Sequence, residues 1–162
     1  MNDQPSSGAN TEQQSNVLNE DNWLVQSLRY TKDYPLLGFL QLCADRRFHR
    51  LIQEEFQRDA NLPEPEDYWI HADAGGTPKM EDSTTAPNYC YHRKGVRLMG
   101  WSAHGATCGG FGDGVDDDVI RAALKETFEK QKTRYREARH FCYFVTIKTK
   151  EDGEETVLYS LK

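Results

Sequence analysis

Residues 35–61, PLLGFLQLCADRRFHRLIQEEFQRDAN, change their hydrophobic pattern halfway along. The first part, residues 35–43, is a continuous apolar run closed by a turn, as expected of a strand buried on both faces of a sheet. The second part, residues 45–61, carries apolar side chains along one stripe at helical spacing, and Asp45 stands where an N-cap is expected. A buried strand followed at once by an amphipathic helix is typical of α/β proteins.

The rest of the chain repeats this alternation. Further strands are predicted at 68–73, 96–103 and 140–148, and helices at 83–92 and 116–138, with Ser83 and Asp116 as their N-caps. The dipeptide Asp152-Gly153 marks a turn that folds the last segment back as a hairpin. We therefore predict an α/β fold with a mainly parallel β-sheet, helices on both faces and a C-terminal antiparallel hairpin. Trp69 and Trp101 are expected to be packing residues near strand ends.

The N-terminal part has a different composition. Residues 1–16 are polar and rich in Ser, Asn and Gln, so a disordered tail is expected there. A helix is predicted to begin near Asn19, where apolar residues recur at helical spacing up to Tyr30. We predict one domain over residues 17–162.

Charge and hydropathy exclude several classes of protein. The formal net charge is -6, which argues against nucleic acid as a partner, because proteins that bind phosphate backbones carry a basic surface. No apolar run approaches the ~20 residues of a membrane-spanning helix, and the N-terminus lacks the basic and apolar regions of a secretory leader. We expect a cytoplasmic protein without membrane contact, in which the four cysteines stay reduced.

The residues most suited to catalysis or ligand binding lie in three segments, each of which follows a predicted strand. Cys43 ends the first strand, the turn Ala74-Gly75-Gly76 follows the second, and the loop from His104 to Cys108 follows the third. In an open parallel sheet, ligands bind beyond the carboxyl ends of the strands, so these segments are expected to meet at one edge. Cys90 and Cys142 lie in periodic apolar contexts and are predicted to be core residues.

Two thiols and an imidazole at one edge are a ligand set for zinc. Zn²⁺ binds thiolate and imidazole in a tetrahedron, and a catalytic site keeps three protein ligands and one open position. We predict that Cys43, His104 and Cys108 bind Zn²⁺. Asp45 and Arg47 follow closely enough to reach the same cleft, although from the residues alone a helix cap and a surface charge are the favoured interpretations.

These motifs resemble those of the β-class carbonic anhydrases. The resemblance covers about residues 35–145: C-x-D-x-R after a first strand, an alanine-glycine turn after a second, and a histidine and a cysteine followed by glycine after a third. It implies zinc on Cys43, His104 and Cys108, and a dyad of Asp45 and Arg47 beside the metal. It also places Ala74, Gly75, Gly76 and Gly109 around the pocket and implies a homodimer or higher homo-oligomer.

Two features depart from the family pattern. His104 and Cys108 have one residue more between them than the usual G-H-x-x-C-G, and HADAGG replaces an Arg-Asn pair before the alanine-glycine turn. The chain therefore resembles a divergent member of the β-carbonic-anhydrase-like superfamily.

The predicted function is reversible, zinc-dependent hydration of carbon dioxide to bicarbonate by a metal-bound hydroxide. Two alternatives stay open at this point. One is a zinc hydrolase of carbonyl sulfide or carbon disulfide, and the other is a non-catalytic zinc-binding protein. His71 is interpreted as a structural residue, with a proton shuttle as the alternative. The acidic run Asp116–Asp118 is interpreted as a solvated start of a helix that complements the helix dipole.

Overall fold

The structure, a computed structural model, describes residues 35–82 and 84–161. The predicted tail, the domain boundary at residue 17 and the helix expected from Asn19 lie outside the described residues, as does Ser83. The described residues belong to the compact unit Pro35–Lys162.

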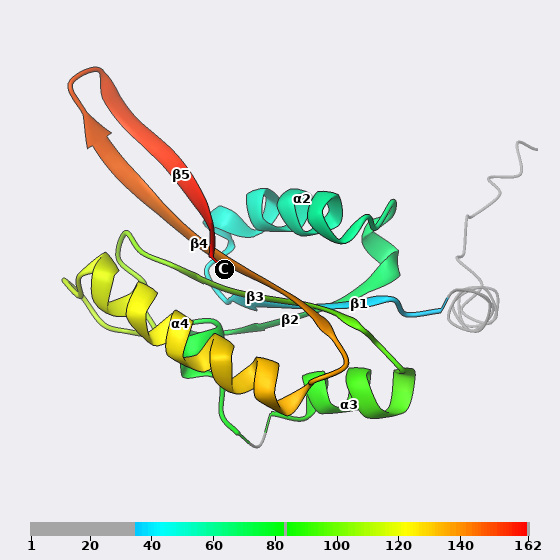
Figure 1. Cartoon of the computed structure of the whole chain (residues 1–162). Coiled ribbons are helices and arrows are strands. Elements are labelled where there is room, and N and C mark those ends of the chain that lie inside the picture. The colour runs from blue at the N-terminus through cyan, green and yellow to red at the C-terminus, as the bar shows by residue number, and fades with distance from the viewer. Residues whose placement is uncertain (1–34, 83, 162) are drawn as a thin grey trace, which may run out of the picture. The chain divides into compact units, whose positions relative to one another are not determined.

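Within these residues the strands form one five-stranded sheet in the order β2-β1-β3-β4-β5 (Figure 1). The strands are β1 (Gly38–Cys43), β2 (Tyr68–Asp73), β3 (Leu98–His104), β4 (Arg139–Lys150) and β5 (Gly153–Leu161). Neighbouring strands from β2 to β4 are parallel, and β5 pairs antiparallel with β4. The predicted α/β fold with a mainly parallel sheet and a C-terminal hairpin is confirmed.

Helices cover both faces of this sheet, as predicted. Helix α2 (His49–Ala60) lies on one face, and α3 (Thr85–Lys94) and α4 (Asp117–Arg134) lie on the other (Figure 1). Short 3-10 turns precede α2, β2 and α3, at η1 (Arg46–Phe48), η2 (Pro65–Asp67) and η3 (Thr77–Lys79). Among the described residues, none of the helices has both the length and the apolar character needed to cross a bilayer.

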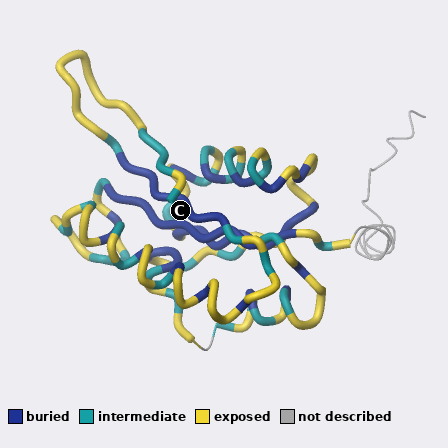
Figure 2. The backbone as a smooth tube through the Cα atoms, viewed as in Figure 1, coloured by how far each residue is buried: buried dark blue, intermediate teal, exposed yellow. Residues whose placement is uncertain are grey.

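The core has two layers because successive strand residues point to opposite faces. On β1, Leu40 and Leu42 pack into a cluster with apolar residues of α2, whereas Phe39 and Cys43 join the cluster beneath α4. Figure 2 shows the central strands as the most continuously buried part of the backbone. Cys90 and Cys142 are fully buried, as predicted.

The two tryptophans differ in environment. Trp101 on the central strand β3 is completely buried, which confirms its predicted packing role. Trp69 is 46% exposed, so the same prediction was wrong for this residue. The cause is the strand order: β2 is an edge strand, and the sequence does not state which strand lies at the edge.

Of the three helices described, only α4 has a side-chain N-cap hydrogen bond; the N-cap of α3 is Thr84, one residue after the predicted Ser83. Asp116 accepts a hydrogen bond from Asp118 N–H, as predicted for an N-cap of α4. Asp45 caps the turn η1, not α2, by accepting from Arg47 N–H. The chain therefore makes one tight turn between Cys43 and α2, which keeps Asp45 and Arg47 at the carboxyl end of β1.

Candidate metal centre

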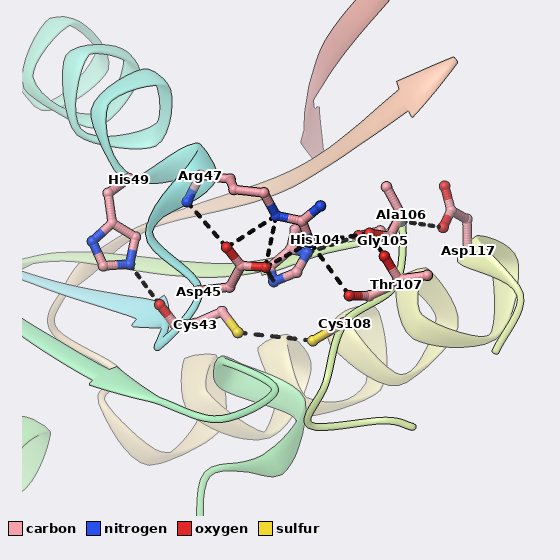
Figure 3. Close-up of polar contacts among 10 residues, drawn as sticks. All are labelled: Cys43, Asp45, Arg47, His49, His104, Gly105, Ala106, Thr107, Cys108 and Asp117. Carbon is pink, nitrogen blue, oxygen red and sulfur yellow. Dashed lines mark hydrogen bonds and ion pairs between the residues drawn. The ribbon is translucent and has the colours of Figure 1, made fainter. Parts of the chain in front are cut away.

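Side chains from β1, from β3 and from the loop after β3 meet beyond the carboxyl ends of these strands. The sulfurs of Cys43 and Cys108 and a ring nitrogen of His104 all lie within 4.8 Å of one another (Figure 3). The three residues are 5%, 1% and 1% exposed, respectively. The sequence thus identified residues that the fold brings together, although the two thiols are 65 positions apart.

The separation of the two sulfurs fits a shared metal. Cys43 Sγ and Cys108 Sγ lie 3.8 Å apart, and both cysteines are free. A disulfide would need about 2.05 Å. Two thiolates on one tetrahedral zinc, each with a Zn–S bond of about 2.3 Å, would lie about 3.8 Å apart. The pair is therefore spaced as two ligands of one ion and not as a cross-link.

The imidazole of His104 is oriented as a ligand. Nδ1 lies 2.7 Å from the carbonyl oxygen of Gly105, so it carries the proton that this oxygen accepts. Nε2 is buried and has no hydrogen-bond partner. Because a buried, unpaired nitrogen is costly and the neutral ring keeps its lone pair on Nε2, this atom is suited to bind a cation. Phe48 packs against the same ring, with 4.9 Å between the ring centroids.

The protein also prepares one thiol for ionisation. Burial disfavours the thiolate of Cys43, but the neighbouring His104 and the backbone amides of Asp45 and Gly75 outweigh it and lower the pKa of this thiol to about 7. Burial raises the pKa of the Cys108 thiol, against hydrogen bonds from the backbone of Gly110 and Phe111. A soft cation between the two sulfurs would favour both thiolates.

Asp45 and Arg47 form a bidentate ion pair on the solvent side of the cluster. Arg47 Nε lies 2.9 Å from Oδ2 and 3.1 Å from Oδ1 of Asp45, and its Nη2 lies 2.6 Å from Oδ2. This pairing with Arg47 lowers the pKa of the Asp45 carboxyl to about 2. Asp45 Oδ2 also lies 3.7 Å from His104 Nε2. An ionised carboxylate of fixed orientation therefore lies beside one of the three candidate ligands.

Arg47 also holds the loop that carries Cys108. Its Nη2 donates to the carbonyl oxygens of Ala106 and Thr107, at 3.1 and 3.3 Å. These two residues have φ angles of 50° and 63°, in the left-handed region that costs a non-glycine residue about 1–2 kcal/mol. They lie where the spacing from His104 to Cys108 exceeds the family pattern, so the extra residue is accommodated as a left-handed turn.

The alanine-glycine turn lies against this loop. Gly75 and Gly76 are buried, and Ala74 is exposed. A Cβ on Gly110 would lie 2.2 Å from the Gly75 nitrogen, so the two backbones touch. Gly109, the pocket glycine expected from the sequence, is exposed, and a Cβ on it would meet nothing within 4 Å. The close contact belongs to the next glycine along the chain.

Two residues near the site were not identified from the sequence. His49 Nε2 donates to the carbonyl oxygen of Cys43 at 2.6 Å and so fixes the backbone of a ligand residue. Asp117 points into the loop instead of into solvent, contrary to the prediction for the acidic run. His71 bonds Gln41 Oε1 at 3.1 Å and lies 3.2 Å from Asp73, in agreement with a structural role.

Comparison with known proteins gives similarity in structure alone. No family model and no curated protein sequence matches the chain. Similar solved structures include the β-carbonic anhydrase CafD of the filamentous fungus Aspergillus fumigatus, with 12% identity, a TM-score of 0.48, and coverage of 78% of this chain and 89% of that chain. The β-carbonic anhydrase CcaA has 13% identity, a TM-score of 0.45, and coverage of 90% and 88%, respectively. The activity in these names is a property of those proteins.

Proposed function

We propose that this protein is a zinc-dependent lyase that converts carbon dioxide and water reversibly to bicarbonate. The observation that supports it best is the convergence of two thiols and an unpaired imidazole nitrogen beside a carboxylate that an arginine holds in place. The motif order along the chain, which resembles that of the β-class carbonic anhydrases, supports the same reaction. Cys43, His104 and Cys108 would hold the zinc.

When bound, zinc would supply the Lewis acidity that lowers the pKa of a water molecule towards ~7. The chain supplies orientation. With a pKa of about 2, the Asp45 carboxyl is too weak a base to remove a proton at neutral pH, but it remains a hydrogen-bond acceptor. Its role is therefore to orient the attacking water and to exclude groups that cannot donate a hydrogen bond. Arg47 sets the direction in which the free lone pairs of Asp45 point.

The non-catalytic alternative has a specific observation in its favour. Asp45 Oδ2 lies close enough to His104 Nε2 that a small rotation could bring it to the metal as a fourth ligand, and a structural zinc site has four protein ligands. Arg47 opposes this movement because it occupies both oxygens of the carboxylate. We therefore favour an open position and a catalytic site.

Stopped-flow measurement of carbon dioxide hydration tests the proposal. Zinc-loaded wild-type protein is expected to exceed Cys108→Ser by at least about 100-fold in kcat/KM, because the variant lacks a ligand. Equal rates would refute catalysis at this site. The hydrolase alternative is tested by supplying carbonyl sulfide or carbon disulfide: release of sulfide would favour it over hydration of carbon dioxide. For the non-catalytic alternative, the visible spectrum of cobalt-substituted protein would not respond to azide.

A further inference from the structure

The carboxylate of Asp117 is turned back from the start of α4 towards the loop that carries Cys108 (Figure 3). Its Oδ1 accepts a hydrogen bond from Ala106 N–H at 3.0 Å. Its Oδ2 accepts one from the hydroxyl of Thr146, a buried residue of β4. One side chain thus ties the loop to a helix and to a strand at the same time.

The acids on either side of Asp117 do not take part in this arrangement. Asp116 caps the helix, and Asp118 is exposed and pairs with Arg121. Both follow the prediction of a solvated helix start. Asp117, between them, differs because its carboxylate accepts hydrogen bonds from Ala106 and Thr146.

Gly105 packs directly against the same carboxylate. A Cβ at this position would lie 2.0 Å from Asp117 Oδ1 and 2.3 Å from its Cγ, so no other residue fits while Asp117 keeps its orientation. Gly105 N–H donates to Val145 O at 2.8 Å, and its carbonyl oxygen accepts the Nδ1 proton of His104. The backbone that orients the imidazole is therefore held between β4 and Asp117.

We propose that Asp117 is a positioning residue for the metal centre, an inference that rests on the zinc site proposed above. Its carboxylate fixes the turn between His104 and Cys108 from the inner side, while Arg47 holds the carbonyls of Ala106 and Thr107 from the outer side. The left-handed turn that places the Cys108 sulfur beside Cys43 is thus held from both sides. A carboxylate suits the position because it accepts from two donors and lies at the positive end of α4.

The test compares zinc affinity, measured by competition with a chelator, in four single variants and one double variant. Asp117→Ala is expected to weaken zinc binding about 10–100-fold, the usual effect of removing a group that supports a ligand. Asp117→Asn keeps an acceptor for Ala106 N–H and should lose less than about tenfold. Asp118→Asn removes the same charge one residue further on, without a bond to the loop, and should stay within about twofold of wild type.

Gly105→Ala provides a second, independent measurement. In the wild-type background its methyl group meets the carboxylate, and zinc affinity should fall about tenfold or more. In the Asp117→Ala background the colliding atoms are gone, so the same substitution should cost about twofold or less. This coupling is specific to the contact between the two residues. If Asp117→Ala does not fold, the single variants Asp117→Asn and Asp118→Asn still compare zinc affinity with and without a change at the loop.

A merely structural role would lower the melting temperature of the metal-free protein and leave zinc affinity and the cobalt spectrum as in wild type. That result, or additive effects of Gly105→Ala and Asp117→Ala, would overturn the proposal and leave the zinc site standing. Wild-type protein that binds no zinc would overturn the metal centre itself and this inference with it.

Discussion

Oδ2 of Asp45 lies 3.7 Å from Nε2 of His104, too far for a hydrogen bond, and a ring nitrogen of the same imidazole lies within 4.8 Å of both cysteine sulfurs. The carboxylate is held in that place by Arg47, and the imidazole by the carbonyl oxygen of Gly105. The charged carboxylate of Asp45 thus lies beside the ligand set and makes no direct hydrogen bond to the imidazole.

Asp45→Asn tests whether this charge serves catalysis. The amide keeps the size of the side chain but loses its charge and half of its acceptor capacity, so we expect the rate of carbon dioxide hydration to fall about 100-fold. Zinc content should stay near that of wild type, because Asp45 is not one of the three ligands. Stopped-flow kinetics with metal analysis on the same preparation measures both. Glu54→Gln, a surface change in an Arg50 pair, is the control and should keep the full rate. An unchanged rate in Asp45→Asn would rule out the role given to this residue.

Cys108→Ser tests the ligand set. Loss of one thiolate should reduce the zinc content from about one per chain to a small fraction, since serine is a poor ligand for zinc. Cys90→Ser, which changes a buried thiol on α3, should keep the zinc although it lowers stability. Mass spectrometry of protein purified without a chelator gives the metal content directly. Equal zinc in the two variants would mean that the metal, if any, binds elsewhere.

Gly110→Ala and Gly109→Ala form a matched pair of variants directly after Cys108. A methyl group on Gly110 would lie 2.2 Å from a backbone nitrogen of Gly75, so the loop would have to move, and we expect a loss of about 1–3 kcal/mol in the free energy of unfolding. A methyl group on Gly109 meets nothing, and the change should be neutral or slightly stabilising. Urea unfolding measures both. A destabilisation of equal size would show that the two backbones do not touch.

The hydrogen bonds of His140 predict that the stability of the protein depends on pH, whether or not a metal is bound. Its Nδ1 accepts the indole proton of Trp101 at 3.0 Å, and its Nε2 donates to Tyr135 O at 3.0 Å, so the folded protein requires the neutral ring. Burial lowers the pKa of His140 below its ordinary value of 6.5. The unfolded state therefore takes up a proton first as the pH falls, and stability is lost below about pH 6.5, by at most about 1.4 kcal/mol per pH unit.

Urea unfolding of metal-free protein at about pH 7.5 and about pH 5 measures this loss, and His140→Gln should reduce it. His92, which is exposed on α3, offers the control: His92→Gln should keep the wild-type dependence. The same loss of stability in His140→Gln as in wild type would assign the pH dependence to other groups.

The order of strands and helices could be predicted from the sequence because it depends on short-range patterns. The apolar run before Cys43, the helical stripe after Asp45 and the turn at Asp152-Gly153 each act over a few residues. The ligand set could be read for a related reason: strand ends of a parallel sheet meet at one edge, so Cys43, His104 and Cys108 were expected together once the strands were placed.

Contacts between distant segments could not be predicted in this way. That Gly110 and not Gly109 touches Gly75, that Asp117 turns inward between two solvated acids, and that Trp69 is exposed on an edge strand all depend on how the elements pack. Neighbouring residues of identical type differ here because the packing places only one of them against another segment.

The sequence by itself determined the fold class and the chemistry of the site, because hydrophobic period, capping residues and donor atoms are properties of the residues and their near neighbours. Only the tertiary structure decided the separation of the two sulfurs and left Nε2 of His104 without a hydrogen-bond partner. It also decided that Arg47 and Asp117 both form hydrogen bonds to the same turn. These are distances between atoms from separate segments, and they are fixed only when the core beneath them is packed.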